Sequence, residues 1–236
     1  MEVQAHGNLF EDIVIKSLTG LSKEEYQKLI PRSYTSSLDL HKDIKVDFNG
    51  SIKTTGGDGI ACSDLLKFFT NTCNNDLRLT VGCWNQINTT TKIFHSVYEF
   101  YIKPEYSKLL WANINEETLS TFVNYVKSIP HGKEAQLKNQ EIWPQKRDAI
   151  FEQYGKGLVS IDAKVDSKIQ RRVQCGLSLK KLIKSTIPYT KYDYEYNKIK
   201  LPFTITSEPR QFKKKISYEI TNNTNQYFEL FACYSR

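Results

Sequence analysis

The sequence predicts an α/β domain with a mixed central sheet flanked by helices, and three observations support this. The chain opens on apolar residues at helical spacing. Two long strand-like runs stand near its middle. A block of helical pattern then precedes a last third that is again strand-like and rich in bases. A chain of 236 residues can bury one good core, so we expect a single domain with a β-rich basic C-terminal part.

Two helices are expected first. Apolar residues recur at helical spacing over residues 9–18, and Gly20 ends that helix. Ser22 stands where an N-cap would begin a second, shorter helix. Pro31 ends it, because proline has no backbone N–H to continue the helical hydrogen bonds.

A hairpin is expected next. Residues 43–48 and 51–55 are both strand-like, and Asn49-Gly50 between them is a strong signal for a two-residue hairpin turn. Residues 54–62 form a glycine-rich loop. Ser63 then has the position of an N-cap, with Asp64 in the first turn of the following helix.

The remaining elements follow the same logic. Residues 76–86 and 91–102 predict two long strands joined by a polar turn. Residues 104–155 carry helical patterns, and residues 157–236 mix strand-like runs with many lysines and arginines.

Composition bounds the class of protein. The net charge of +7 permits a polyanionic partner without proving one. Five scattered cysteines without CxxC spacing predict reduced, mostly buried thiols, which fits a cytoplasmic protein and argues against structural zinc. No apolar run reaches about 18 residues, so we expect no membrane span, and no secretory leader is visible.

One constellation of residues carries chemistry. Ser51 and Lys53 point to one face of a strand because side chains alternate with period two, and Ile52 offers its carbonyl oxygen between them. Phosphodiester hydrolysis needs a divalent metal, oxygen ligands that hold it, and a cation that orients the nucleophile. Because serine is a poor magnesium ligand, Asp64 would have to supply the missing carboxylate.

Strand parity selects among the earlier aspartates. With Asn49-Gly50 as the turn, Asp47 would lie across from Ile52 and face away from Lys53. Asp39 precedes the strand and is free of that constraint, so we expect it to be a ligand. A bulge would readmit Asp47, and Asp58 in the glycine-rich loop is a further alternative. His41, near in sequence, is expected to be an exposed loop histidine.

The order and spacing of Asp39 and Ser51-Ile52-Lys53 resemble the PD-(D/E)XK nuclease superfamily, and more narrowly type II restriction endonucleases, over residues 5–103. The chain departs from the acidic-X-Lys pattern at Ser51. Some restriction enzymes share this Ser-X-Lys form and draw the acid from a following helix, where Asp64 stands. The resemblance implies a restriction-endonuclease-like core and Mg²⁺ held by Asp39, Asp64 and the Ile52 carbonyl. It also implies a contribution from Glu11 on the first helix and products with a 5′-phosphate.

The basic C-terminal third suits contact with DNA. Lysine and arginine bind phosphates, while arginine and glutamine on rigid elements read base edges. On a strand, Gln170, Arg172 and Gln174 would share one face and Arg171 the other. The DNA-binding candidates are Lys168, Gln170, Arg171, Arg172, Gln174, Lys213, Lys214 and Lys215.

Together these features predict a sequence-specific endonuclease for double-stranded DNA. We expect a catalytic core over residues 1–103, a helical segment over 104–156 and a DNA-recognition part over 157–236. A palindromic site would pair with a homodimer. Two alternatives stay open: a structure-specific repair or recombination nuclease, and a basic DNA-binding module without catalysis.

Overall fold

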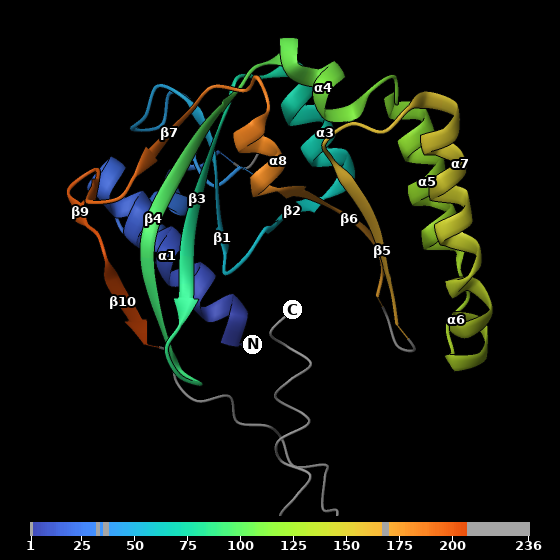
Figure 1. The fold of residues 1–236 in the computed structure, drawn as a ribbon, viewed down its shortest axis with the longest axis horizontal. Helices are drawn as coiled ribbons and strands as arrows, with labels where there is room; N and C mark the ends of the chain where they lie inside the picture. The colour runs from blue at the N-terminus through green and yellow to red at the C-terminus, as the bar shows by residue number, and fades with distance from the viewer. Residues whose placement is uncertain (1, 32–33, 35–37, 167–169, 207–236) are drawn as a thin grey trace, which may run out of the picture.

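The computed structural model describes residues 2–31, 34, 38–166 and 170–206, and in this part the chain forms a mixed α/β fold (Figure 1). Its elements, in chain order, are α1 (Glu2–Thr19), α2 (Lys23–Leu29), β1 (Asn49–Thr55), β2 (Gly59–Asp64), α3 (Leu65–Asn74), β3 (Leu77–Gln86), β4 (Thr91–Ile102), η1 (Pro104–Tyr106), α4 (Ser107–Trp111), α5 (Glu116–Ser128), α6 (Lys133–Gln140), α7 (Ile142–Tyr154), β5 (Ser160–Val165), β6 (Arg171–Ser178), α8 (Leu179–Lys184), β7 (Tyr189–Tyr192), β8 (Glu195–Tyr196), β9 (Ile199–Lys200) and β10 (Phe203–Thr206).

The central sheet is mixed and has β1 at one end. Its strand order is β1-β3-β4-β10, with β7 also paired to β4. β1 runs parallel to β3, so that Lys53 pairs with Val81, whereas the other pairs are antiparallel. The long β3–β4 pair was predicted and is confirmed. Strands β7 and β10 from the last third of the chain complete the sheet, so it joins segments that are far apart in the sequence.

A second sheet curls away from the first. Its order is β2-β6-β5, and all its pairs are antiparallel. The pairing of β2 with β6 shifts between Ala61 and Ser63, and Ser63 has a φ of 74°. A bulge of this kind bends its strand. It stands immediately before Asp64, where β2 passes into α3.

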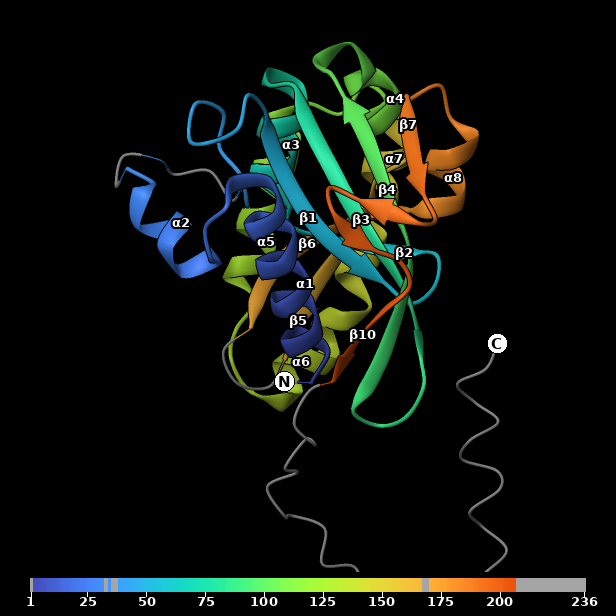
Figure 2. The same ribbon diagram turned by 90° about the vertical axis from the view of Figure 1, so that its left-hand side faces the viewer.

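The central sheet has a hydrophobic cluster on each face. On one face α1 packs against the sheet, with Phe10 stacked on Phe94 at 4.8 Å between ring centroids. Gly82 permits this approach, because a Cβ there would lie 2.4 Å from the Phe10 ring. On the other face Leu79 and Val81 join the second sheet, α3 and α5 in a larger cluster. Figure 2 shows α1 on the near side of the central sheet, with α3, α5 and α7 behind it.

The helices follow the sequence closely. Ser22 caps α2 in a reciprocal pair with Glu25, as the predicted N-cap requires. Gly20 has a φ of 78° just after α1, which it ends as predicted. The expected helical segment is confirmed as η1 and α4–α7. α3 begins one residue later than predicted, with Asp64 rather than Ser63 as its N-cap.

The predicted hairpin at Asn49-Gly50 is wrong. Both residues are the first residues of β1, and residues 43–48 form turns with positive φ at Asp43 and Lys45. Gly50 instead forms an antiparallel bridge with Leu40, whose side chain is fully buried. Burial of Leu40 and the pairing of β1 with β3 depend on distant parts of the chain, and these interactions outweigh the local turn signal.

The four described cysteines are free thiols, and three of them are buried, as expected. Cys233 lies outside the described residues. In the part of the chain that the structure describes, no helix has the length and apolar character needed to cross a bilayer.

Candidate active site

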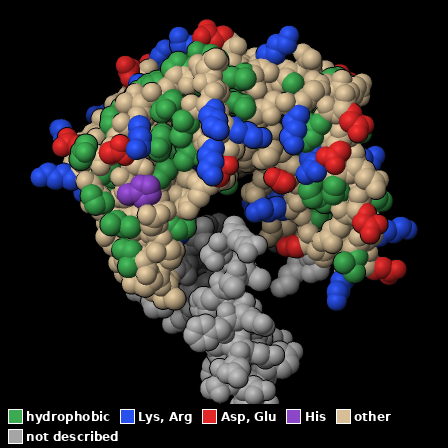
Figure 3. All heavy atoms as spheres, viewed as in Figure 1, with side chains coloured by type: hydrophobic (Ala, Val, Ile, Leu, Met, Phe, Trp, Pro, Cys, Tyr) green, Lys and Arg blue, Asp and Glu red, His purple; other side chains and the backbone are tan. Residues whose placement is uncertain are grey.

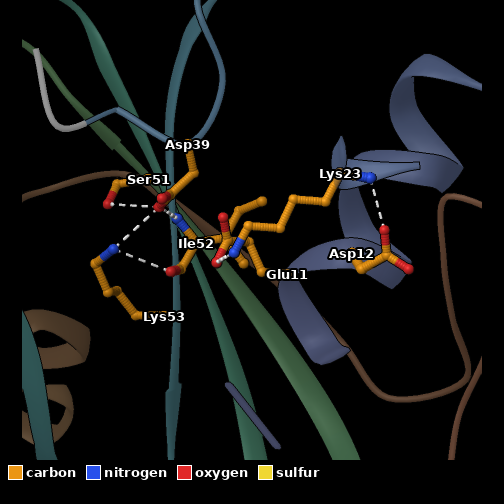
Figure 4. A network of polar contacts seen from close by, with 7 residues as sticks. All are labelled: Glu11, Asp12, Lys23, Asp39, Ser51, Ile52 and Lys53. Carbon is orange, nitrogen blue, oxygen red and sulfur yellow. Dashed lines mark hydrogen bonds and ion pairs between the residues drawn. The ribbon is translucent and has the colours of Figure 1, made fainter. Parts of the chain in front are cut away.

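Asp39 and Lys53 meet at the outer edge of β1. The Asp39 Oδ2 atom accepts hydrogen bonds from the Ile52 N–H at 2.6 Å, the Lys53 Nζ at 3.0 Å and, at 3.3 Å, the Ser51 hydroxyl (Figure 4). Lys53 Nζ also donates to the Ile52 carbonyl oxygen at 3.0 Å. One ammonium group therefore bridges a carboxylate oxygen and a main-chain carbonyl oxygen.

The end position of β1 makes this arrangement possible. The sheet pairs β1 with β3 on one side only, so both the N–H and the carbonyl of Ile52 are available to side chains. Asp39 is brought alongside by the backbone, because its N–H donates to the Gly50 carbonyl at 2.9 Å. The carboxylate is thus positioned by a main-chain bridge rather than by a turn.

Glu11 reaches the same region from α1. Its carboxylate accepts from Lys23 Nζ at 2.7 Å, and Figure 4 shows it beside Ile52. Burial raises the pKa of Glu11 and the nearby negative charge of Asp39 raises it further, while Lys23 and Lys53 oppose both effects. Two carboxylates therefore lie close enough to repel each other, and each has a lysine partner. Ionisable groups whose pKa values are perturbed by burial and by a neighbouring charge cluster at functional sites.

Lys23 joins Glu11, Asp39 and Lys53 in a cluster of charged side chains, and the sequence analysis did not identify it. It is the first residue of α2, and its N–H donates to Asp12 Oδ1 at 2.6 Å, which ties α2 to α1. Its side chain is 23% exposed and Glu11 is 16% exposed. No local pattern marks Lys23, because its approach to Glu11 depends on how two separate helices pack.

Asp64 has a structural role at the start of α3. It caps that helix by accepting from the Lys67 N–H at 3.0 Å. Among the described residues it makes no hydrogen bond or ion pair with Lys53. Its role as a metal ligand, expected from the sequence, stays a prediction.

The two alternative carboxylates are also elsewhere. Asp47 is exposed in the turn before β1. Asp58 accepts from the Ser178 hydroxyl and from the Lys180 N–H, both at 2.7 Å. Those bonds lower the pKa of Asp58, the Ser178 bond most. Asp58 therefore binds the start of α8.

His41 is buried, which corrects the expectation of an exposed loop residue. It is 1% exposed, and its N–H donates to the Tyr26 hydroxyl at 2.9 Å. Burial lowers the pKa of the imidazole, and the charge of Asp39 acts in the opposite direction. Its loop packs onto α2, which the sequence did not indicate.

Among the DNA-binding candidates, Arg171 is engaged within the fold. Its guanidinium donates to the carbonyls of Ile129 and Pro130 at the end of α5. It also donates to the carbonyls of Asp166 and Gln170. The first two bonds join the β5–β6 connection to the end of α5, and the other two brace the connection itself, so Arg171 supports the structure.

Arg172 and Gln174 point away from the core, as strand parity predicts. They alternate on β6 with the buried Val173 and Cys175, and Arg172 is exposed. Gln170 is exposed just before the strand. Lys168, Lys213, Lys214 and Lys215 lie outside the described residues.

The oxygen atoms at the edge of β1 suit a magnesium ion. Among the described residues, no group of three His, Cys, Asp or Glu side chains could hold a metal. Mg²⁺, however, is usually bound through one or two carboxylates, with waters and substrate phosphates as further ligands. Asp39, Glu11 and the Ile52 carbonyl supply hard oxygen donors of this kind.

Comparisons of this chain with known protein families, curated proteins and solved structures give no match. The function of this chain is therefore inferred from the chemistry of the site itself.

Proposed function

We propose that this protein is a Mg²⁺-dependent endonuclease that cleaves double-stranded DNA at a defined sequence, with a core of the restriction-endonuclease type. One observation carries the proposal: Lys53 Nζ bridges the Asp39 carboxylate and the Ile52 carbonyl at the open edge of β1. In metal-assisted phosphodiester cleavage, an acid and a main-chain oxygen of this kind can hold the metal ion, and a lysine can orient the attacking water.

Asp39, the Ile52 carbonyl and Glu11 are the groups that would hold the metal ion. When bound, Mg²⁺ neutralises the phosphate and lowers the pKa of water. Lys53 now donates to two of the same oxygen atoms. With those oxygens engaged by a cation, its ammonium group would be free to orient the attacking water. In the net reaction the water oxygen bonds to phosphorus as the P–O3′ bond breaks, and the proton that the water loses balances the one that the 3′-oxygen takes up. The products are a 5′-phosphate and a 3′-hydroxyl.

The exposed face of β6 is the surface we assign to base recognition. Arg172 pairs with Lys164 of β5 in register, and Gln174 pairs with Asp162. Arginine and glutamine have the donor geometry to read base edges, and rigid strands hold them in place. A palindromic site would be read by two copies of the chain.

A DNA-binding module without catalysis is the second candidate, and one observation favours it. Ser51 stands where an acid is expected, and its hydroxyl donates to Asp39 rather than offering a negative charge. This leaves Glu11 as the second carboxylate, reached from a different element. The two candidates differ in a single measurable property, which is metal-dependent cleavage.

Digestion of bacteriophage DNA with Mg²⁺, against an EDTA control, tests the proposal. The wild-type protein should give discrete bands. Lys53→Met and Asp39→Asn should abolish cutting and retain DNA binding. Asparagine is chosen because its oxygen can still accept from the Ile52 N–H and so preserve the loop.

Two control variants carry the same types of substitution, Lys→Met and Asp→Asn, in surface ion pairs away from the site. Lys191→Met and Asp148→Asn each break an exposed pair and should cut like wild type. Binding without cutting by the wild-type protein would favour the non-catalytic module. Wild-type cutting by Lys53→Met or Asp39→Asn would overturn the assigned site.

A further inference from the structure

Helix α8 presents three lysines on one face. Lys180, Lys181 and Lys184 are all exposed, while Leu182 is fully buried against the core. Positions three and four apart are neighbours on a helix, so Lys184 lies beside both of the others. Within the described part of the chain, none of the three makes an ion pair. Figure 3 shows Lys and Arg side chains gathered over α8, above the hollow between the central sheet and the α5–α7 helices.

Asp58 fixes α8 to the turn that follows β1. Its two carboxylate oxygens accept from Ser178 and from the Lys180 N–H, and its main-chain carbonyl accepts from the Leu179 N–H at 2.8 Å. Three bonds from one residue thus hold the start of α8. Because Asp58 is five residues beyond Lys53, the position of α8 is set directly from the strand that carries the candidate site.

The path from the site to α8 is short. Thr55 is the last residue of β1, two residues after Lys53, and its hydroxyl donates to the Gly59 carbonyl at 2.8 Å. Gly59 pairs with Ser178, which is the N-cap of α8. The start of α8 is therefore held against the end of the strand that carries Lys53.

We propose that the α8 lysines bind the phosphate backbone of the DNA that occupies the candidate active site, and that Asp58 is the residue that positions them relative to Lys53. This rests on the proposed function, because it takes DNA as the polyanion. Exposed lysines that form no ion pair are suited to phosphate contact and carry no information about base sequence, and Asp58 is the acidic group whose charge acts on Lys180 and Lys181. α8 therefore contributes affinity and register.

Binding of a labelled duplex in EDTA, measured by anisotropy from 50 to 200 mM KCl, tests the lysines without cleavage. Each phosphate contact contributes about 0.9 to the slope of log K against log salt, or roughly 8-fold in affinity at 0.1 M. A variant with Lys180, Lys181 and Lys184 all changed to Gln should reduce the slope by about 2 to 3. The control changes Lys28, Lys103 and Lys108, exposed lysines on α2 and around η1 and α4, and should keep the wild-type slope.

Asp58 variants test the positioning role separately. Asp58→Asn removes the negative charge but keeps an oxygen that can accept from the Lys180 N–H, so binding should equal or exceed that of wild type. Asp58→Ala removes the same charge and the acceptor, and should weaken binding because α8 is no longer held. Equal binding by the two variants would overturn the positioning role.

The outcomes separate this inference from the proposed function. If the wild-type protein binds and cuts DNA but the triple lysine variant keeps its salt slope, the phosphate contact by α8 is overturned and the nuclease assignment stands. If the salt slope depends on the α8 lysines but the wild-type protein does not cut DNA, the nuclease assignment is overturned and the phosphate contact by α8 stands. Absence of wild-type DNA binding overturns both.

Discussion

Replacement of Arg171 by alanine should destabilise the fold, whereas replacement of its neighbour Arg172 should not. Of the four carbonyls that Arg171 contacts, those of Ile129 and Asp166 are in part-buried bonds, and the other two are exposed and can be satisfied by water. With about 1 kcal/mol for each part-buried bond, the loss is about 2 kcal/mol. For a chain of this length it corresponds to a fall in Tm of roughly 4 to 8 °C.

Thermal and urea unfolding of Arg171→Ala, Arg172→Ala and wild type provide the assay. Arg172→Ala should stay within about 0.5 kcal/mol of wild type, as exposed substitutions usually do, and should change cleavage specificity on altered DNA sites. Two results would contradict this role of Arg171: a wild-type unfolding midpoint for Arg171→Ala, or a lower stability for Arg172→Ala than for Arg171→Ala. Either result would mean that the carbonyl contacts of Arg171 do not hold α5 to the β5–β6 connection.

Three further predictions follow from the described contacts. Because the pKa of Glu11 is raised, its carboxylate takes up a proton at a higher pH than an ordinary glutamate does. The affinity of the protein for Mg²⁺, measured by calorimetry, should therefore fall as the pH is lowered. Glu11→Gln should weaken Mg²⁺ binding and remove that pH dependence, and an unchanged profile would exclude Glu11 as a ligand. Asp64→Ala should lower the free energy of unfolding by about 1 kcal/mol through loss of the α3 cap, with Mg²⁺ affinity unchanged; lost Mg²⁺ binding would restore Asp64 as a ligand. Gly82→Ala should destabilise the chain by about 1 to 3 kcal/mol, because the new Cβ would lie 2.4 Å from the Phe10 ring, and a wild-type midpoint in urea would contradict that packing.

Local signals predicted most of the helices and the longest strands. The Ser22 cap, the Gly20 stop and the apolar spacing of α1 depend on residues within a few positions of one another. The β3–β4 pair is joined by a short polar turn, so its pairing also follows from neighbouring sequence. Patterns of this range are the ones that sequence periodicity records.

The geometry of the candidate site does not follow from local sequence patterns alone. Asp39 and Lys53 were expected to meet, and they do, yet the hairpin from which strand parity was argued does not form. The contact arises because Leu40 is buried and bridges Gly50, which brings Asp39 beside β1. The expectation named the residues that meet but gave the wrong structural cause.

By itself, the sequence determined most of the helical segments, the positions of β3 and β4, and which acid and lysine meet at the edge of β1. These features depend on periodicity, capping and the order of a few chemical groups. The sequence did not indicate the short helix α8, which lies in a part of the chain expected to be strand-like. Only the tertiary structure decided that β1 pairs with β3 and that Glu11 with Lys23 completes the cluster. It also assigned Asp64 and Asp58 to helix starts. The reason is physical: these contacts join segments whose approach is set by burial of two cores, and no local pattern encodes it.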